Sequence, residues 1–163
     1  MGIILGIETE TGEEIPLWFT ETDSKLLRRQ LWDAYYGSTN VEIFRIFNHF
    51  HLSVKPLTKI VGRGEEEELN ELFSRDPNNA WGREYGPERM AVIQTAWQSP
   101  ESLIKIIQPL LAGMEQEPKV FAELNIADEY FVDGAFCHDM MDLVTMLDWA
   151  LRKGIRKVRL VEG

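Results

Sequence analysis

Apolar residues recur at three- and four-residue intervals in four separate parts of the chain, and this helical spacing limits the possible folds more than any other feature. The spacing is found in residues 26–35, 43–50, 103–114 and 140–151. Strand-like runs are short and span residues 2–8, 15–19, 90–97 and 155–161. The two kinds of segment do not alternate as in a βαβ protein. The sequence therefore predicts a helix-dominated α+β fold with a small mixed or antiparallel sheet that includes the N- and C-terminal strands.

The length predicts one domain over residues 1–163, because 163 residues suit a single hydrophobic core and no linker or repeat divides them. The apolar run from Ile3 to Leu5 is far too short for a membrane helix, as is every other unbroken apolar run in the sequence. The N-terminus lacks the basic leader of a signal peptide, so we expect a cytoplasmic protein. Cys137 is the single cysteine, which excludes an internal disulfide and agrees with a reducing compartment.

Several helix ends are indicated by capping residues. Ser99 followed by Pro100 is a typical helix start. Residues 41–50 fit either a strand or a helix, and the capping-box pair Thr39 and Glu42 favours the helix. Asp139 is expected to cap the last helix, which continues to Lys153 and stops at Gly154. The alternating residues after Gly154 predict a half-exposed terminal strand.

The formal net charge of −10 repels nucleic-acid phosphates, so we do not expect nucleic acid as a partner. Residues 120–151 contain no Lys or Arg, although they carry seven acidic residues: Glu123, Asp128, Glu129, Asp133, Asp139, Asp142 and Asp148. One interpretation is an acidic face that binds a basic protein. The other is that the charge serves solubility alone.

Two groups of residues could bind a metal or catalyse a reaction, but each group also has a purely structural interpretation. His49 and His51 would share one face of a strand and could then bind a metal, but they diverge in a helix. Cys137, His138 and Asp139 are consecutive, whereas catalytic partners usually converge from separated positions. No nucleotide-binding, metalloprotease or nucleophile motif occurs. We therefore predict no cofactor and no metal site, and consider an enzyme less well supported than a binding protein.

The irregular segment 74–87 is the most promising binding element in the sequence, because long loops in compact domains often carry function. Trp81 and Tyr85 offer apolar contact area, and Arg83 can pair with a carboxylate or a phosphate. Asp76 completes the group of candidate binding residues. In the alternative interpretation Trp81 folds back and anchors the loop to the core.

Three segments of the sequence resemble the YfbM-like family of uncharacterised bacterial proteins. They are Met1-Gly2 with its following apolar strand, the run Trp97-Gln98-Ser99-Pro100-Glu101-Ser102-Leu103, and the end of the chain from Asp139-Met140 through Leu151-Arg152-Lys153-Gly154 to the terminal strand. The resemblance implies an α+β domain from a bacterium. It implies no activity, and so no functional residues are carried over.

Together these features predict a small acidic cytosolic protein that binds a basic protein partner, in an immunity-like or regulatory role. The alternative is a small-ligand-binding protein or enzyme with a pocket beside residues 74–87. A third hypothesis is a structural subunit of a larger assembly. The oligomeric state is left open by the sequence.

Overall fold

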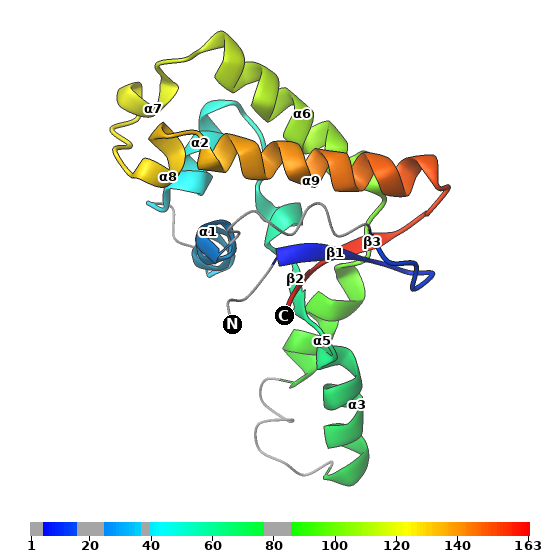
Figure 1. The fold of residues 1–163 in the computed structure, drawn as a ribbon. Helices are drawn as coiled ribbons and strands as arrows, with labels where there is room; N and C mark the ends of the chain where they lie inside the picture. The colour runs from blue at the N-terminus through cyan, green and yellow to red at the C-terminus, as the bar shows by residue number, and fades with distance from the viewer. Residues whose placement is uncertain (1–4, 16–24, 37–39, 77–85) are drawn as a thin grey trace.

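A computed structural model arranges helices around one small sheet, and it describes residues 5–15, 25–36, 40–76 and 86–163 (Figure 1). The described residues form eight α-helices, one 3-10 helix and three strands. In chain order these are β1 (Leu5–Thr9), α1 (Lys25–Tyr35), α2 (Glu42–His49), η2 (Lys55–Thr58), β2 (Ile60–Gly62), α3 (Glu65–Arg75), α5 (Gly86–Thr95), α6 (Pro100–Gln116), α7 (Val120–Glu123), α8 (Glu129–Val132), α9 (Ala135–Arg152) and β3 (Val158–Glu162).

The sheet has the order β1-β3-β2, so the C-terminal strand lies in its centre. Strand β1 pairs antiparallel with β3, and β2 pairs parallel with it, which confirms a mixed sheet containing both terminal strands. The prediction of a half-exposed terminal strand is wrong. Residues 158–161 are all buried, Arg159 included. The reason is that β3 has a neighbour along each edge and apolar clusters against both faces, which contain Leu160 and Val161 respectively.

Helices α6 and α9 lie side by side over the sheet and supply much of the main core (Figure 1). The fully or nearly fully buried residues at their interface are Leu103, Ile107, Leu110, Met140, Leu143 and Leu147. The predicted start of α6 is confirmed, because the Ser99 side chain accepts a hydrogen bond from the Ser102 backbone N–H at 3.1 Å. Among the described residues, no helix combines the length and the apolar character needed to cross a membrane.

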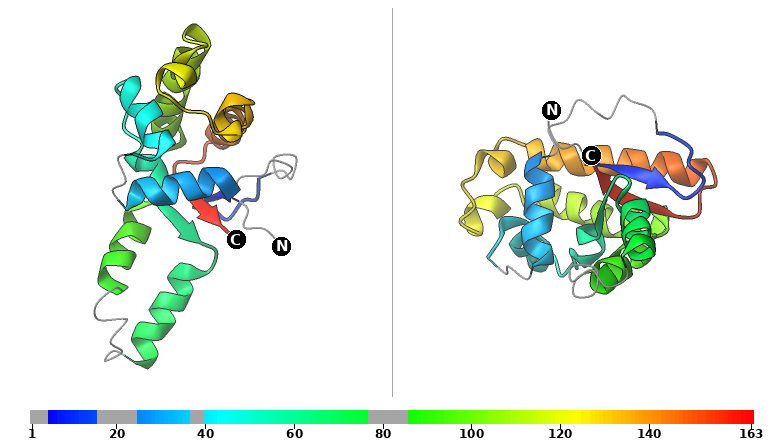
Figure 2. Two further views of the ribbon diagram at one scale, coloured as in Figure 1. Left: turned by 90° about the vertical axis from the view of Figure 1, so that its left-hand side faces the viewer. Right: turned by 90° about the horizontal axis from the view of Figure 1, so that it is seen from below.

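Helices α3 and α5 project from the sheet on the side opposite α6 and α9 (Figures 1 and 2). The predicted strand at residues 90–97 is wrong, since residues 86–95 form α5. The β-branched residues Val92 and Ile93 suggested a strand, but Pro87 suits the first turn of a helix. Ile93 is buried with Leu69 of α3 in a second, smaller apolar cluster. Packing of α5 on α3 therefore decides the conformation of this segment.

Residues 41–50 are helical, as the capping residues indicated, but the cap itself is different. The N-cap of α2 is Val41, whose side chain makes no capping hydrogen bond. Instead Gln30 of α1 supplies the cap: its Oε1 accepts from the Ile43 backbone N–H at 3.1 Å, and its Nε2 donates to Glu42 Oε2 at 2.8 Å. Thr39, the predicted cap, lies outside the described residues. A neighbouring helix has thus replaced the expected local contact.

Candidate functional site

A pocket of about 370 Å³ opens where α1, α8 and α9 meet. Its lining residues come from all three helices and from the turn between α8 and α9: Leu26, Glu129, Tyr130, Asp133, Ala135, His138 and Asp139. Three of the seven are carboxylates and one is a histidine. The volume lies in the range of small-ligand sites, so the pocket can hold one small molecule or a single side chain.

Local chain geometry determines how α8 presents its acidic residues. The Asp128 side chain caps α8 by accepting from the Tyr130 backbone N–H at 2.9 Å. The Asp133 backbone N–H donates to the Glu129 carbonyl at 2.9 Å, which closes one helical turn. Because residues four apart lie on one side of a helix, Glu129 and Asp133 both face the pocket. Gly134, with φ +93°, then turns the chain directly into α9.

Asp139 lies in the inner part of the pocket and is only 4% exposed. Tyr130 Oη donates a hydrogen bond to Asp139 Oδ2 at 2.7 Å. The Tyr130 ring is held by edge contacts with Phe131 and Phe136, whose centroids lie 5.0 and 6.0 Å away. The prediction that Asp139 caps the last helix is wrong, because α9 begins four residues earlier, after its N-cap Gly134. The carboxylate is therefore available to the pocket rather than to the helix end.

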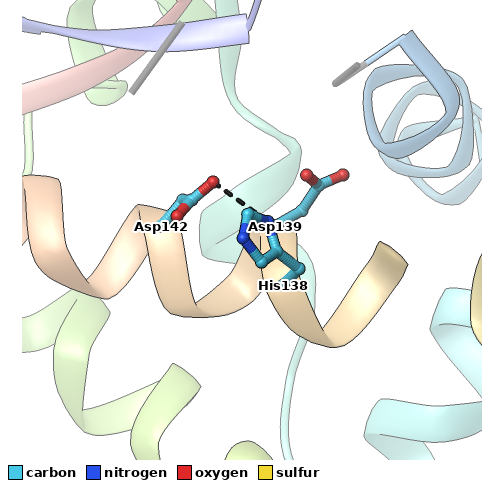
Figure 3. A group of neighbouring side chains, drawn as sticks. All are labelled: His138, Asp139 and Asp142. Carbon is cyan, nitrogen blue, oxygen red and sulfur yellow. Dashed lines mark ion pairs between the residues drawn. The ribbon is translucent and has the colours of Figure 1, made fainter. Parts of the chain in front are cut away.

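His138 and Asp142 form a second pair one turn apart on α9, with Nδ1 and Oδ2 3.3 Å apart (Figure 3). The donor atoms of His138, Asp139 and Asp142 all lie within 4.8 Å of one another, and these residue types can hold a metal ion. Figure 3 shows the Asp139 carboxylate directed away from the His138–Asp142 pair. Asp139 Oδ2 accepts from Tyr130 Oη, so a metal bound by all three residues would share this carboxyl group with Tyr130.

Apart from the buried Asp139, the acidic residues of 120–151 separate into two sets in the structure. On α9, Asp142 is paired with His138 and Asp148 with Arg152, at 2.8 Å for the second pair. Four others are exposed along α7 and α8, at one end of the molecule (Figure 1): Glu123, Asp128, Glu129 and Asp133. We call these four residues the acidic end. The pocket lies within it, because Glu129 and Asp133 belong to both.

Of the candidate residues from the long loop, the structure describes Asp76 alone, and Asp76 does not line this pocket. Asp76 is exposed directly after α3, at the far end of the projecting helix pair from α8 (Figure 1). Trp81, Arg83 and Tyr85 lie outside the described residues, so their predicted role stays a prediction. The sequence did indicate the acidic members of the pocket through the charge imbalance of residues 120–151. It gave no sign of Leu26 or Tyr130, because these approach only through helix packing.

Two groups were singled out in the sequence, the pair His49 and His51 and the run Cys137, His138 and Asp139. In the structure the members of each group have different surroundings. His49 of α2 contacts Glu117 at 2.8 Å, whereas His51 follows the helix in a left-handed conformation with φ 57°. Cys137 is half-buried against the core, and burial, together with the nearby negative charge of Glu115, raises its pKa. Its neighbours contact other groups, since His138 pairs with Asp142 and Asp139 with Tyr130.

No family model, curated protein or solved structure matches the chain in comparisons with known proteins. The site must therefore be interpreted from its own chemistry. That chemistry is a mostly apolar, open pocket bordered by three acidic residues, two of which belong to the exposed acidic end. Such a site favours a cationic group as its ligand.

Proposed function

We propose that this protein is a binding module that recognises a basic protein partner through the acidic end, in an immunity-like or regulatory role. The observation that carries the proposal is the pocket lined by Glu129, Asp133 and Asp139 within this exposed acidic surface. Exposed acidic residues are enough for solubility. A pocket among them is not needed for solubility, but it is useful for binding. It supplies a place where a partner's side chain can be buried, which is where binding energy concentrates.

Charge complementarity supports a basic partner. The chain carries a net charge of −10, and the segment that forms α7, α8 and most of α9 contains no Lys or Arg before Arg152. An acidic surface of this kind accelerates association with a basic protein and disfavours acidic competitors. The same field repels nucleic acid, so a protein partner fits the charge better than DNA or RNA.

The proposal is tested by affinity capture with matched charge variants, at low and at high salt. The tagged protein is compared with Glu123→Lys/Asp133→Lys in the acidic end and with Glu71→Lys/Glu101→Lys as a control. The control acids are exposed and lie on α3 and α6, so both double variants change the net charge equally. We expect a basic protein to be retained by the wild type and by the control, and lost from the acidic-end variant and at high salt. Equal retention by all three proteins, or retention of none, would contradict the proposal.

A second candidate function, a small-ligand-binding protein or enzyme, is favoured by one observation. The His138 imidazole is oriented by Asp142 and borders the pocket, an arrangement suited to proton transfer to a bound molecule. A cationic metabolite that occupies the pocket would raise the melting temperature by mass action. Asp133→Asn would remove that rise, whereas the distant Asp76→Asn would leave it unchanged.

Two further proposals concern the cellular location and the family of the protein. We propose that the protein acts in the cytoplasm, because its single cysteine agrees with a reducing compartment. We also propose membership of the YfbM-like family of bacterial proteins, on the three segments that resemble it. Neither proposal adds a residue to the site or assigns a reaction.

A further inference from the structure

The lining of the pocket places like charges together, and this arrangement is unfavourable unless a cation joins them. Glu129 and Asp133 are both exposed and lie four residues apart, at the start of α8 and directly after its end. Like charges at this spacing repel each other. Asp139 adds a third carboxylate to the lining, and none of the described lining residues is Lys or Arg. A cationic ligand would convert this repulsion into attraction.

Resting on the proposed function, we propose that the pocket binds the guanidinium group of one arginine side chain supplied by the basic partner. The apolar part of the lining suits an arginine, because Leu26 and Ala135 can cover its methylene stem. Leu26 is 45% exposed, so it loses unfavourable contact with water when a side chain covers it. Leu26 belongs to α1 and Ala135 to α9, so the stem would lie between two helices.

The polar part of the lining favours arginine over lysine. A guanidinium has five donors in a planar fork, and it can serve two carboxylates at once. Glu129 and Asp133 provide two separate exposed acceptor groups, and the buried Asp139 carboxyl group also belongs to the lining. An ammonium is more strongly hydrated and satisfies fewer of these contacts.

The arrangement of the side chains argues for an organic cation rather than a metal ion. A zinc ion needs its ligand atoms at about 2.0–2.2 Å. The Asp139 carboxylate is turned toward Tyr130 and away from the His138–Asp142 pair (Figure 3). A guanidinium makes longer contacts, at about 2.7–2.9 Å, and can be bound without moving Asp139. Metal binding is accordingly a separate outcome of the test.

The test is a solution NMR titration of the full chain, labelled with ¹⁵N, with three small probes. N-acetyl-arginine amide is compared with N-acetyl-citrulline amide, which has the same length and no charge, and with zinc chloride. We expect the arginine probe to shift the backbone amide signals of residues 129–139 in a saturable way, and the citrulline probe to leave them unchanged. Asp133→Asn should weaken arginine binding by about fivefold to tenfold, because one charge-assisted contact is lost.

Glu71→Gln serves as the matched control, since this acid is exposed on α3 and lies outside the pocket. It should leave arginine binding unchanged, and circular dichroism should show that both variants are folded. Equal shifts with arginine and citrulline, no saturable shift with arginine, or binding of zinc alone would each overturn the inference. Its failure is separable from that of the proposed function: capture of a basic partner that depends on the acidic end would still support the latter.

Discussion

The guanidinium of Arg159 lies over the ring of Trp97, 4.2 Å from the ring centroid. Arg159 Nε donates to Glu8 Oε2 at 3.0 Å, and Nη1 donates to Glu66 Oε2 at 2.9 Å. The side chain is only 6% exposed. One buried cation on the central strand therefore joins strand β1, helix α3 and Trp97, which lies two residues after the end of α5.

Arg159→Met should lower the free energy of unfolding by about 2 kcal/mol, as measured by urea denaturation. The loss is expected because methionine keeps an apolar contact with Trp97 but cannot pair with either glutamate. It should stay below the largest values for buried ion pairs, because the Glu8 and Glu66 side chains are partly exposed and water can solvate them after the substitution.

Arg152→Met is the matched control for this substitution. Arg152 pairs with Asp148 one turn away on α9, and its side chain is 80% exposed. Exposed pairs of this kind contribute little, so the change in unfolding free energy should stay within about 0.5 kcal/mol. Equal effects of the two variants would show that burial of Arg159 contributes nothing to stability.

Gln30→Ala should destabilise the protein by about 1 kcal/mol, because the start of α2 loses the side chain that caps it. The Ile43 backbone N–H would lose its acceptor, and Glu42 would lose a hydrogen-bond donor. The measurement is again urea denaturation. Gln108→Ala on the exposed face of α6 is the control. It should change the free energy of unfolding by no more than about a few tenths of a kcal/mol, and in the stabilising direction, because alanine has the higher helix propensity. A neutral Gln30→Ala variant would mean that water caps α2 equally well.

Tyr130→Phe should destabilise the fold by about 1–2 kcal/mol, because a buried carboxylate loses a hydrogen-bond donor. The phenyl ring keeps its contacts with Phe131 and Phe136, so the variant isolates the hydroxyl group. The control is Tyr36→Phe, since Tyr36 is 67% exposed at the end of α1. Thermal unfolding of both variants should show a clear loss for the first and almost none for the second. The opposite order would be incompatible with the Tyr130–Asp139 bond.

Cys137 should ionise at a higher pH in the folded protein than in the unfolded chain. Its pKa is raised mainly by burial and further by Glu115, so the folded state holds the thiol proton more tightly. The stability that this provides is fully present below the ordinary thiol pKa and is lost as pH rises through the raised folded value. The pH at which the rate of alkylation by iodoacetamide levels off should therefore be higher without urea than with it. Glu115→Gln should lower the folded value, and a folded value at or below that in urea would refute the assignment.

Elements with strong local signals were predicted correctly from the sequence. The start of α6 depends on Ser99 and Pro100 alone. Residues 41–50 fitted either a strand or a helix, and the capping residues favoured the helix that occupies Glu42–His49. Predictions that depended on the surroundings were wrong. Residues 90–97 were expected to form a strand, and packing of Ile93 against α3 stabilises a helix there.

The candidate site, too, was predicted from the sequence only in part. The shortage of cations in residues 120–151 pointed to an acidic surface, and the structure places four of its acidic residues along α7 and α8. Nothing in the sequence indicated that Leu26 approaches α9, or that Asp139 is buried against Tyr130 rather than capping a helix. These contacts join residues that the chain separates by turns or by more than a hundred positions.

The sequence by itself determined the helix-dominated α+β class, the negative charge and the start of α6, because apolar periodicity and capping act over a few residues and net charge depends on composition alone. Tertiary structure alone decided that β3 is the central strand, that Arg159 is buried, and that three carboxylates share one pocket. These features depend on which distant segments pack together. That choice is made by the burial of the whole apolar surface rather than by any single stretch of chain.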